Sequence, residues 1–485
     1  MPRWRTAAAF LLLALPALAA AQDLQDAVTA TEQFEYSYDT ETRREIFENW
    51  LDVSYVFGSF RTGILLNAQQ PSEEGFRTTR IRHRFFEFAL DDVTVRAGHF
   101  YGLFGRGLVF ASYEDRAIRV DTALDGVIAT AERGGVRGTL FSGTPSEVSR
   151  DVRGGDVEAD LGRSWLVGAT GLTYEAPAPS GATRANREWV AAGRISRLFP
   201  FGDFYAEYGR KQGYDFDPVP DGESDEGHAA YGSASILAGP VSLVVEGKDY
   251  RRFAVIRRAD GRVPLNNPPA LTREHTYTLL SRNARNLDPD DEVGAQGELT
   301  VTGPSGWNAV ASANRTERHD GRLLFEEVYT SLEKERMGPF RLRGAFGYQD
   351  GESLAKTAVG DATWFIDEER ALTLQAQHQH VDLGGGPGFD LGEFEQQFFE
   401  LEFSAAPHWT VTGVLEINNK YPEQRLLPDE DERPFPALAV SYINSSGGSI
   451  TLWLGKRQAG QICTGGVCKF EPAFEGVELS GTFRY

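Results

Sequence analysis

The sequence lacks a hydrophobic run long enough to cross a bilayer as a helix. The apolar run from Phe10 to Leu18 is shorter than the roughly 18 to 20 consecutive apolar residues that a spanning helix needs, and no other stretch comes closer. Helical membrane proteins are therefore excluded. A closed β-barrel is not excluded, because it too satisfies its backbone hydrogen bonds internally.

Positive charge and enzyme signatures are also scarce. The formal net charge is −21, from 49 Lys and Arg against 70 Asp and Glu, so the chain would repel nucleic acid and we expect no such partner. The Gly-x-Ser-x-Gly, His-Glu-x-x-His and Gly-Lys-Ser/Thr motifs do not occur. His378 and His380 share a face of a predicted strand and could chelate a metal, but a lumen-facing coincidence is the preferred interpretation. We expect no enzyme, no cofactor and no metal site.

The chain has only two cysteines, Cys463 and Cys468, in a glycine-rich segment that ends at Pro472. In an exported chain such a pair favours a disulfide that pins a loop. A redox site is disfavoured, because the Cys-x-x-Cys spacing and a nearby histidine are absent.

An export signal is present at the start of the chain. Arg3 and Arg5 precede the apolar run and the small residues 19–21 follow it, which predicts a signal peptide over residues 1–21. Residues 22–485 contain no Pro/Ser linker and no break in composition. We therefore expect them to form a single domain, an outer-membrane β-barrel.

Alternation of apolar and polar residues with period two recurs from end to end, which is typical of half-buried strands. About twenty such segments, at roughly 9 to 11 residues per tilted strand, predict an all-β fold, a large antiparallel transmembrane β-barrel of about 18–22 strands. A soluble solenoid or sandwich is the rival interpretation. The predicted signal peptide and the aromatic last residue favour the barrel.

The last alternating segment, residues 477–485, has two chemically different faces. One face has the apolar side chains Val477, Leu479, Phe483 and Tyr485, and the other has Glu478, Ser480, Thr482 and Arg484. We expect the first face to meet lipid and the second to meet water.

Barrels of this class place both termini in the periplasm, so we expect the loop before the last strand, residues 456–476, outside the cell. Tyrosines near the ends of the alternating runs predict aromatic girdles at the membrane interfaces: Tyr36, Tyr38, Tyr101, Tyr174, Tyr208 and Tyr348. The expected location is the outer membrane of a Gram-negative bacterium. The expected partners are its lipid and lipopolysaccharide and the barrel-assembly machinery, and a homo-oligomer is left open.

Residues 100–126 break the alternation. Three glycines within six residues permit positive φ, and opposite charges gather nearby: Arg106, Glu114, Asp115, Arg116, Arg119 and Asp121. Inside a barrel these side chains could form a constriction that sorts solutes by charge. The alternative is that they pair with one another to hold an inward loop or to cover one end of the barrel.

Residues 251–292 form the second break, because their prolines exclude a central strand and predict a long loop. Loops of this length usually have a function, and this one would plug the lumen or lie across its mouth. Its candidate residues are Asn266, Asn267, Glu274 and His275. We expect Glu274 and His275 to form a structural hydrogen-bonded pair rather than a ligand site.

Three groups of residues resemble an uncharacterised family of exported envelope proteins. They are Gly105-Arg106-Gly107-Leu108 with residues 112–116, Asn266-Asn267-Pro268-Pro269 with Glu274-His275, and Gly455-Lys456-Arg457 with the cysteine loop. The family occurs in Bacteroidetes and related Gram-negative bacteria and has only a domain-of-unknown-function label. The resemblance implies an outer-membrane or envelope β protein and no particular substrate. The last strand departs from the usual barrel-assembly signal, since Ser480 stands where glycine is usual.

The leading functional hypothesis is a porin-like channel for small polar solutes whose lumen is narrowed by residues 102–126, by residues 251–292, or by both. The alternative is a non-conducting envelope protein that acts as a surface-binding module or as a scaffold of a secretion or adhesion complex.

Overall fold

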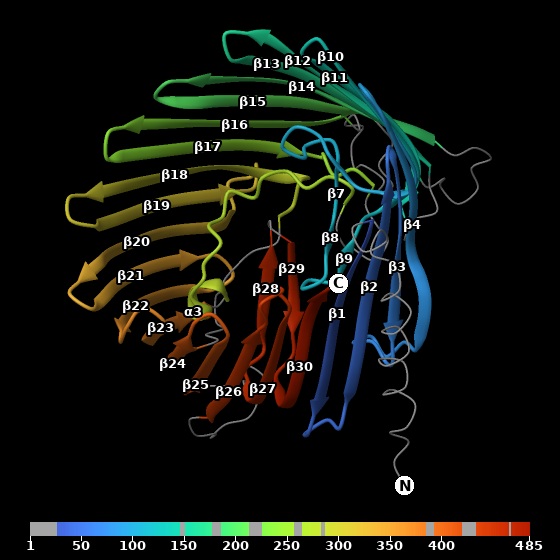
Figure 1. Ribbon diagram of the computed structural model, residues 1–485. Helices are drawn as coiled ribbons and strands as arrows, with labels where there is room; N and C mark the ends of the chain where they lie inside the picture. The colour runs from blue at the N-terminus through green and yellow to red at the C-terminus, as the bar shows by residue number, and fades with distance from the viewer. Residues whose placement is uncertain are drawn as a thin grey trace.

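The computed structural model describes residues 27–145, 151–176, 186–212, 226–256, 264–282, 287–384, 392–419, 433–464 and 467–485. In these residues 24 strands form one antiparallel sheet, and the sheet closes into a barrel because the first strand pairs with the last (Figure 1). The predicted all-β barrel is confirmed. Residues 1–21 lie outside the described residues, so the signal peptide stays a prediction.

The wall strands follow one another around the barrel in chain order. They are β1 (Val28–Asp39), β2 (Glu45–Phe57), β3 (Phe60–Gln69), β4 (Thr78–Leu90), β5 (Val93–Phe100), β10 (Leu124–Arg133), β11 (Val136–Pro145), β12 (Val152–Gly162), β13 (Trp165–Ala176), β14 (Asn186–Phe199), β15 (Gly202–Gln212), β16 (Glu226–Ala238), β17 (Val241–Arg251), β18 (Asp291–Gly303), β19 (Trp307–Glu317), β20 (Leu323–Met337), β21 (Phe340–Asp350), β22 (Leu354–Phe365), β23 (Arg370–Asp382), β24 (Glu393–Ala405), β25 (Trp409–Asn418), β26 (Arg433–Ile443), β27 (Ser449–Arg457) and β30 (Phe474–Arg484).

In the part of the chain that the structure describes, six short strands and one helical turn lie outside the wall, within the ring of strands in Figure 1. They are β6 (Gly102–Leu103), β7 (Ala111–Ser112), β8 (Glu114–Asp115), β9 (Val120–Asp121), α3 (Thr278–Ser281), β28 (Gly460–Thr464) and β29 (Val467–Glu471). None of the helices in the described residues is long and apolar enough to cross a membrane.

The number of strands is above the expected range of 18–22. One reason is that proline and glycine hide the alternation in some strands. Pro434 and Pro436 lie in β26, where their missing N–H groups are tolerated because the pairing of β26 with β27 begins only at Ala437. In β12, Gly154 and Gly155 also interrupt the alternation of apolar and polar side chains.

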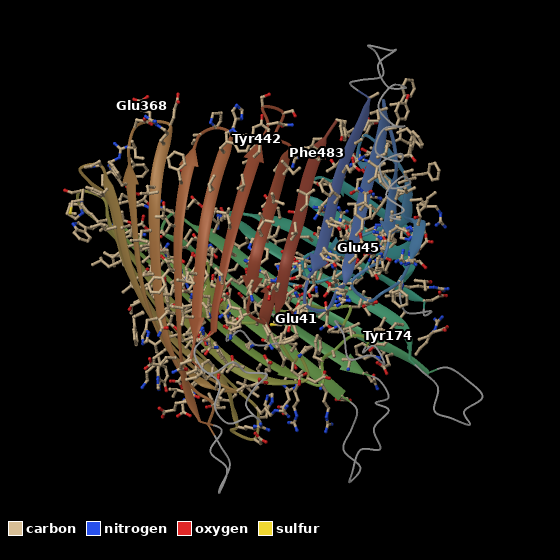
Figure 2. The ribbon with its side chains drawn as sticks, turned by 90° about the horizontal axis from the view of Figure 1, so that it is seen from below. Glu41, Glu45, Tyr174, Glu368, Tyr442 and Phe483 are labelled. Atoms are coloured by element: carbon tan, nitrogen blue, oxygen red, sulfur yellow. The ribbon has the colours of Figure 1, made fainter. Side chains whose placement is uncertain are left out.

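The two ends of the barrel differ in their connections. At one end, which we call the short-turn rim, strands are joined by turns such as 58–59, 91–92 and 338–339; at the opposite end, the loop rim, the connections reach the length of 252–290. β1 begins and β30 ends at the short-turn rim. Figure 2 places Glu368, Tyr442 and Phe483 at this rim and Glu41 towards the other.

The short turns have the backbone geometry that tight hairpins require. Gly134 and Gly135, between β10 and β11, both have positive φ, 60° and 79°. A type I′ turn needs positive φ at both central residues, and its twist matches that of the paired strands. Glycine adopts these angles without a Cβ clash, which fixes the register of the hairpin.

The register of β30 against its neighbours confirms the predicted faces of the last strand. Glu478, Ser480 and Thr482 are direct partners of Ser37, Glu35 and Gln33 on β1 and face the lumen with them. The outward side chains include Phe483, which stacks on Phe34 with ring centroids 6.2 Å apart.

The outward face is apolar and exposed around the barrel. On β24, Phe399, Leu401 and Phe403 point outward and are exposed, whereas Glu400 and Glu402 point inward. Large exposed aromatic side chains gather near the short-turn rim: Phe57, Phe201, Trp307, Phe340, Trp364, Phe365, Trp409 and Tyr485. Such a belt is typical of a membrane interface.

The tyrosines chosen from the sequence mark this belt less well. Tyr36, Tyr38, Tyr208 and Tyr348 face outward in the half of the barrel near the loop rim. Tyr174 is instead buried inside the barrel, 4% exposed, and Tyr101 begins an inward segment rather than ending a wall strand. A tyrosine at the end of an alternating run does not by itself reveal which face of the strand it occupies.

Candidate functional site

Among the described residues, three connections at the loop rim fold into the barrel. We call residues 101–123 the first inward segment, the described part of 252–290 (residues 252–256, 264–282 and 287–290) the second inward segment, and residues 458–464 and 467–473, which contain β28 and β29, the inward hairpin. Each of them contacts a different part of the inner wall. Together they decide how much of the lumen is open.

The first inward segment begins against β15. The backbone N–H of Arg106 donates to Glu207 Oε2 at 3.0 Å, and the Arg106 guanidinium lies over the Tyr205 ring, 5.1 Å from its centroid. Gly105 has a φ of 57°, and a Cβ there would lie 2.6 Å from the Glu207 carboxylate. This close approach explains why glycine occupies the position.

The segment then turns back across the lumen to β1 and β2. Arg116 Nη2 donates to Asp52 Oδ2 at 2.9 Å and to Glu114 Oε2 at 3.2 Å, and Nη1 donates to Gln33 at 3.2 Å. The Arg116 guanidinium also lies 5.5 Å from the ring centroid of Trp50. Arg116 therefore joins the segment to two wall strands at once.

Arg119 forms ion pairs with three carboxylates on the same side of the barrel. Its Nη2 lies 2.7 Å from Glu35 Oε2 and 2.9 Å from Glu48 Oε2, and its Nε lies 3.4 Å from Glu73 Oε2. The Glu48 side chain is only 3% exposed. Burial opposes the charged form of Arg119, but Glu35 and Glu48 outweigh it and raise its pKa.

Asp121 ends the segment on β4. Arg82 Nε donates to Asp121 Oδ2 at 2.8 Å, His83 Nε2 lies 2.9 Å from the same oxygen, and Tyr101 donates to Oδ1 at 3.1 Å. Burial alone would raise the pKa of Asp121, but the hydrogen bond from His83 and the charge of Arg82 hold it well below its ordinary value. Asp115 Oδ1 accepts the backbone N–H groups of Ala117 and Ile118 and closes the turn.

The second inward segment is joined to the first through a buried asparagine. Asn266 Nδ2 donates to the carbonyl oxygens of Leu108 at 2.9 Å and Phe253 at 3.0 Å, and its Oδ1 accepts the N–H of Val255 at 2.8 Å. Asn267 N donates to Gly107 O at 3.2 Å. All three amide hydrogen bonds of Asn266 are internal, so the two segments form one body.

From there the second segment follows the inner wall from β17 to β20. Lys248 Nζ on β17 lies 2.6 Å from Glu292 Oε2, with both side chains fully buried, and donates to Ala270 O at 2.6 Å. Arg273 pairs with Glu298 on β18. His275 Nε2 lies 2.8 Å from Glu327 Oε2 on β20. His275 is thus part of a structural hydrogen bond, but with Glu327 of the wall rather than with the neighbouring Glu274.

The segment continues to β25 through α3. Leu279 and Leu280 are buried, and glutamines of the inner wall bond their backbone: Gln377 accepts Leu279 N at 2.9 Å, and Gln379 donates to Leu279 O at 2.8 Å. Arg282 Nη2 then donates to Glu416 Oε2 at 2.8 Å. The second segment therefore runs along the wall over β17 to β25.

The inward hairpin borders the remaining part of the lumen. Lys469 Nζ donates to Glu73 Oε2 and to Glu471 Oε1, each at 2.6 Å. Cys463 and Cys468 are direct register partners across β28 and β29. Cross-strand partners lie within the Cα separation that a disulfide spans, so the register is compatible with the predicted disulfide.

A hydrophobic core holds the two inward segments to β10–β17. Leu108, Val109 and Phe110 are fully buried, and the Phe110 ring lies 4.7 Å from that of Phe141 on β11. Val255 and Leu265 of the second segment belong to the same core. Burial of a large apolar side chain contributes about 1.5–3 kcal/mol, so these residues anchor the segments more strongly than surface ion pairs would.

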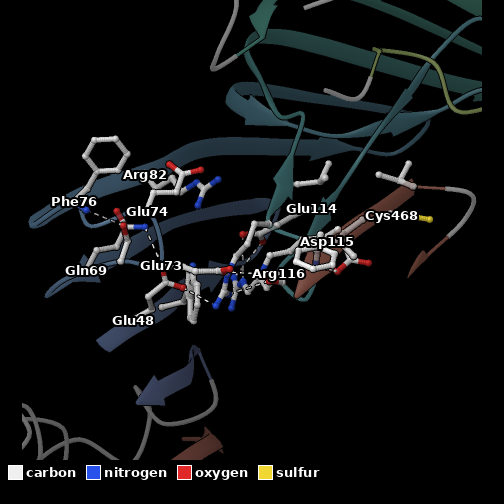
Figure 3. A pocket seen from close by; sticks show the side chains of 18 of the residues that line it. Glu48, Gln69, Glu73, Glu74, Phe76, Arg82, Glu114, Asp115, Arg116 and Cys468 are labelled. Atoms are coloured by element: carbon white, nitrogen blue, oxygen red, sulfur yellow. Dashed lines mark hydrogen bonds and ion pairs between the residues drawn. The ribbon is translucent and has the colours of Figure 1, made fainter. Parts of the chain in front are cut away.

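The three inward segments and the wall strands β2–β4 enclose a cavity of about 1270 Å³, which we call the central cavity (Figure 3). Figure 3 shows Glu73 and Glu48 on its wall side and Glu114, Asp115 and Arg116 opposite them. The cavity is larger than a usual small-molecule pocket of roughly 300–1000 Å³. No group of three or more His, Cys, Asp or Glu side chains in the described ranges is placed to hold a metal ion.

The candidate residues chosen from the sequence fall into two groups. Glu114, Asp115, Arg116 and Arg119 line the central cavity together with Asn266 and Asn267. Arg106 and His275 contact the wall outside the cavity, and Asp121 does not line the cavity but pairs with Arg82, which does. Glu274 has an interaction partner but does not line the cavity. The ion pairs run mainly from segment to wall, and among the described residues Arg116 with Glu114 is the one ion pair within the candidate set.

Sequence reasoning missed the wall side of the cavity. Trp50, Glu48 and Arg80 belong to ordinary alternating strands, and nothing local separates them from other inward residues. The glutamines of β23 could have been found, because Gln375, Gln377 and Gln379 alternate along one strand. His378 and His380 point outward between them, not into the lumen as expected.

Solved structures share this fold at very low sequence identity. The structure of the P pilus usher (PapC) translocation pore matches with a TM-score of 0.51 and 9% identity, over 94% of this chain and 99% of that chain. The copper transporter OprC matches with a TM-score of 0.44, 11% identity and coverages of 95% and 81%. A BenF-like porin from Pseudomonas fluorescens Pf-5 matches with a TM-score of 0.36, 8% identity and coverages of 95% and 99%. The first of these similarities supports the fold of an outer-membrane barrel, and the other two are too low to carry an argument.

No curated protein matches the chain. A family model does match, over residues 21–309 and 341–485, and it describes a family of unknown function. The expected origin in Bacteroidetes stays a prediction. The chain belongs to this family, DUF6029.

Proposed function

We propose that the protein is a porin-like channel for small polar solutes in the outer membrane of a Gram-negative bacterium, with a lumen narrowed by its own inward segments. The observation that carries the proposal is the central cavity, a charged space of about 1270 Å³ at the loop rim that the three inward segments leave between them. Charged side chains at a constriction select solutes by charge and size.

The two faces of the wall support the membrane location. Side chains such as Leu140 and Phe86 are 72% and 58% exposed on the outward face, which would be unfavourable in water by about 25 cal/mol per Å² of apolar surface. Contact with hydrocarbon removes this cost. The short-turn rim would lie in the periplasm and the loop rim outside the cell, surrounded by lipid and lipopolysaccharide, after insertion by the barrel-assembly machinery.

The course of the inward segments supports a narrowed passage. The second segment follows the wall over β17–β25, and the first reaches the wall at β1, β2, β4, β11 and β15. Segments that line the inner wall narrow the lumen and add charged groups to its surface. The usher that shares the fold is described as a translocation pore, and we propose passage of solutes for this chain as well.

Planar-bilayer conductance of the refolded protein tests the proposal. A variant in which a short Gly/Ser linker replaces residues 102–121 should conduct several-fold more than wild type, because conductance rises with the open cross-section. As a control, five Gly/Ser residues replace residues 318–322, a loop whose His319 bonds the outward-facing Asp249 and Asp291. That change should leave conductance unaltered. Absence of current from wild type and from the 102–121 variant would contradict the channel.

One observation favours the alternative, a non-conducting envelope protein that binds a partner or serves as a scaffold of a secretion or adhesion complex. The buried core around Phe110, Phe141 and Tyr250 packs the inward segments against the wall. If the segments close the lumen, the loop rim becomes a rigid surface on which the Cys463–Cys468 pair, which we propose is a disulfide, holds the hairpin. Co-purifying partners together with zero conductance would favour this function. We propose neither a cofactor nor catalysis for either.

A further inference from the structure

The central cavity carries an excess of positive charge in a chain whose formal net charge is −21. Seven cationic side chains line it against five acidic ones. The cationic residues are Arg44, Arg77, Arg80, Arg82, Arg116, Arg119 and Lys469, and the acidic residues are Glu48, Glu73, Glu74, Glu114 and Asp115. The chain as a whole has the opposite balance, with 49 Lys and Arg against 70 Asp and Glu.

The acidic side chains of the cavity already have hydrogen-bond or ion-pair partners within the protein. Glu48 and Glu73 pair with Arg119, and Glu73 also pairs with Lys469. Glu114 pairs with Arg116. Asp115 accepts two backbone N–H groups, and Glu74 has an interaction partner too.

Arg44, Arg77 and Arg80 differ from the other cations. They are exposed, they line the cavity, and among the described residues none of them has a side-chain hydrogen bond or an ion pair. They come from three places, the β1–β2 loop, the β3–β4 loop and the inward face of β4. Their charges are therefore the uncompensated charges of the cavity.

A second observation concerns Trp50 on the cavity wall. Its indole N–H is buried and has no hydrogen-bond acceptor among the described residues. A buried donor without an acceptor is costly, and most such donors in proteins are satisfied. The guanidinium groups of Arg116 and Arg119 lie over the same ring. Because both groups are positively charged, they also favour a negatively charged acceptor near the indole N–H.

We propose that Arg44, Arg77 and Arg80 bind small solutes that carry two or more oxyanion groups, carboxylate or phosphate, and that they make the passage anion-selective. A guanidinium matches the geometry of both groups through paired N–H donors. The selectivity rests on the proposed channel function, whereas the binding does not. The cavity volume admits such a solute with part of its water shell.

The test compares two variants with the same change in charge. The first is R44Q/R77Q/R80Q. The control is R187Q/R210Q/R315Q, which removes three exposed arginines of the outward face that pair with carboxylates there. Heat-modifiable gel migration shows that each variant is folded. A third variant, R44K/R77K/R80K, keeps the charge of the cavity.

Two measurements on each protein separate binding from conduction. The anion-to-cation permeability ratio comes from the reversal potential in a KCl gradient. Citrate binding is measured by calorimetry in detergent, and inorganic phosphate, which has a single oxyanion group, should bind more weakly. We expect wild type, the control and the lysine variant to prefer anions, and R44Q/R77Q/R80Q to lose roughly fivefold or more in both the permeability ratio and citrate affinity.

The outcomes distinguish the two proposals. A channel whose selectivity and citrate affinity are the same in R44Q/R77Q/R80Q and wild type would overturn the anion site and leave the channel. A protein without current that loses citrate binding only in R44Q/R77Q/R80Q would keep the site and overturn the channel. Loss of both in the control variant as well would overturn the site, because the effect would then come from net charge.

Discussion

Replacing Arg119 with methionine removes the cation that joins the first inward segment to β1 and β2. Methionine keeps the length of the side chain and its contact with the Trp50 ring, whose centroid is 5.2 Å from the guanidinium. Glu35 and Glu48 then lose their ion-pair partner, whereas Glu73 keeps Lys469. The Glu48 side chain is 3% exposed, so water cannot replace the lost cation.

The expected magnitude follows from burial. Breaking a buried ion pair by removing one partner costs about 3–5 kcal/mol. Since 1.4 kcal/mol is a factor of ten in an equilibrium constant, about 3 kcal/mol raises the undocked population of the segment roughly a hundredfold. The apolar anchor around Phe110 is untouched. We therefore expect local undocking of residues 113–121 and an intact barrel.

Trypsin and conductance measure this undocking. Arg116 lies in the released stretch, so cleavage there should become much faster in the variant, and the current should show larger and more frequent openings. The matched control is R315M, whose exposed ion pairs contribute about 0–1 kcal/mol. The double variant E48Q/R119M should recover part of the protection, because it removes the stranded charge. Cleavage of R119M at the rate of R315M would refute the reasoning.

Three further changes test other parts of the structure. Phe110→Ala, in the core of the inward segments, should lower the free energy of unfolding by about 3–5 kcal/mol, read from urea denaturation in detergent. Gly347→Leu should displace α3, since a Cβ there lies 2.4 Å from Leu280, and should expose residues 278–282 to hydrogen exchange. Asp121 has a folded pKa below its unfolded value of about 4, so its stabilisation is full above that pH and is lost as pH falls below it. Conductance should thus be constant from pH 5 to 8 and rise below about pH 4, and Asp121→Asn should abolish that rise.

The faces of the strands could be predicted because the alternation is local. For residues 477–485, odd or even position alone assigns each side chain to a face of the strand, and the pairing of β30 with β1 confirms these faces. The two inward segments could be predicted as breaks in the alternation, because this signal is local too: the prolines near Asn266 and the glycines near Arg106 exclude a regular wall strand.

The partners of the candidate residues could not be predicted. Arg119 is 84 residues from Glu35 in sequence, and Arg116 is 64 residues from Asp52. These residues meet only because the inward segment folds back onto the strands of the wall, and that depends on the tertiary structure of the barrel. The same holds for Arg282, which reaches Glu416 across 134 residues. Such contacts have no local signal in a single sequence.

The anion site was beyond sequence reasoning for a related reason. Arg44, Arg77 and Arg80 are ordinary charged residues in or beside loops, and what distinguishes them is that their neighbours in space leave them unpaired. The net charge of −21 argued against an anion site, because it sums the charges of the whole chain. A local field inside a cavity can differ in sign from the total.

Labelling of single cysteines on β24 tests the central claim most directly. In a background with Cys463 and Cys468 replaced by serine, cysteine is placed at inward Glu402 or outward Leu401, and the protein in liposomes is exposed to a hydrophilic maleimide. A wall with water inside and hydrocarbon outside predicts fast labelling at position 402 and protection at position 401. Equal labelling of the two positions, or the reverse order, would contradict the account.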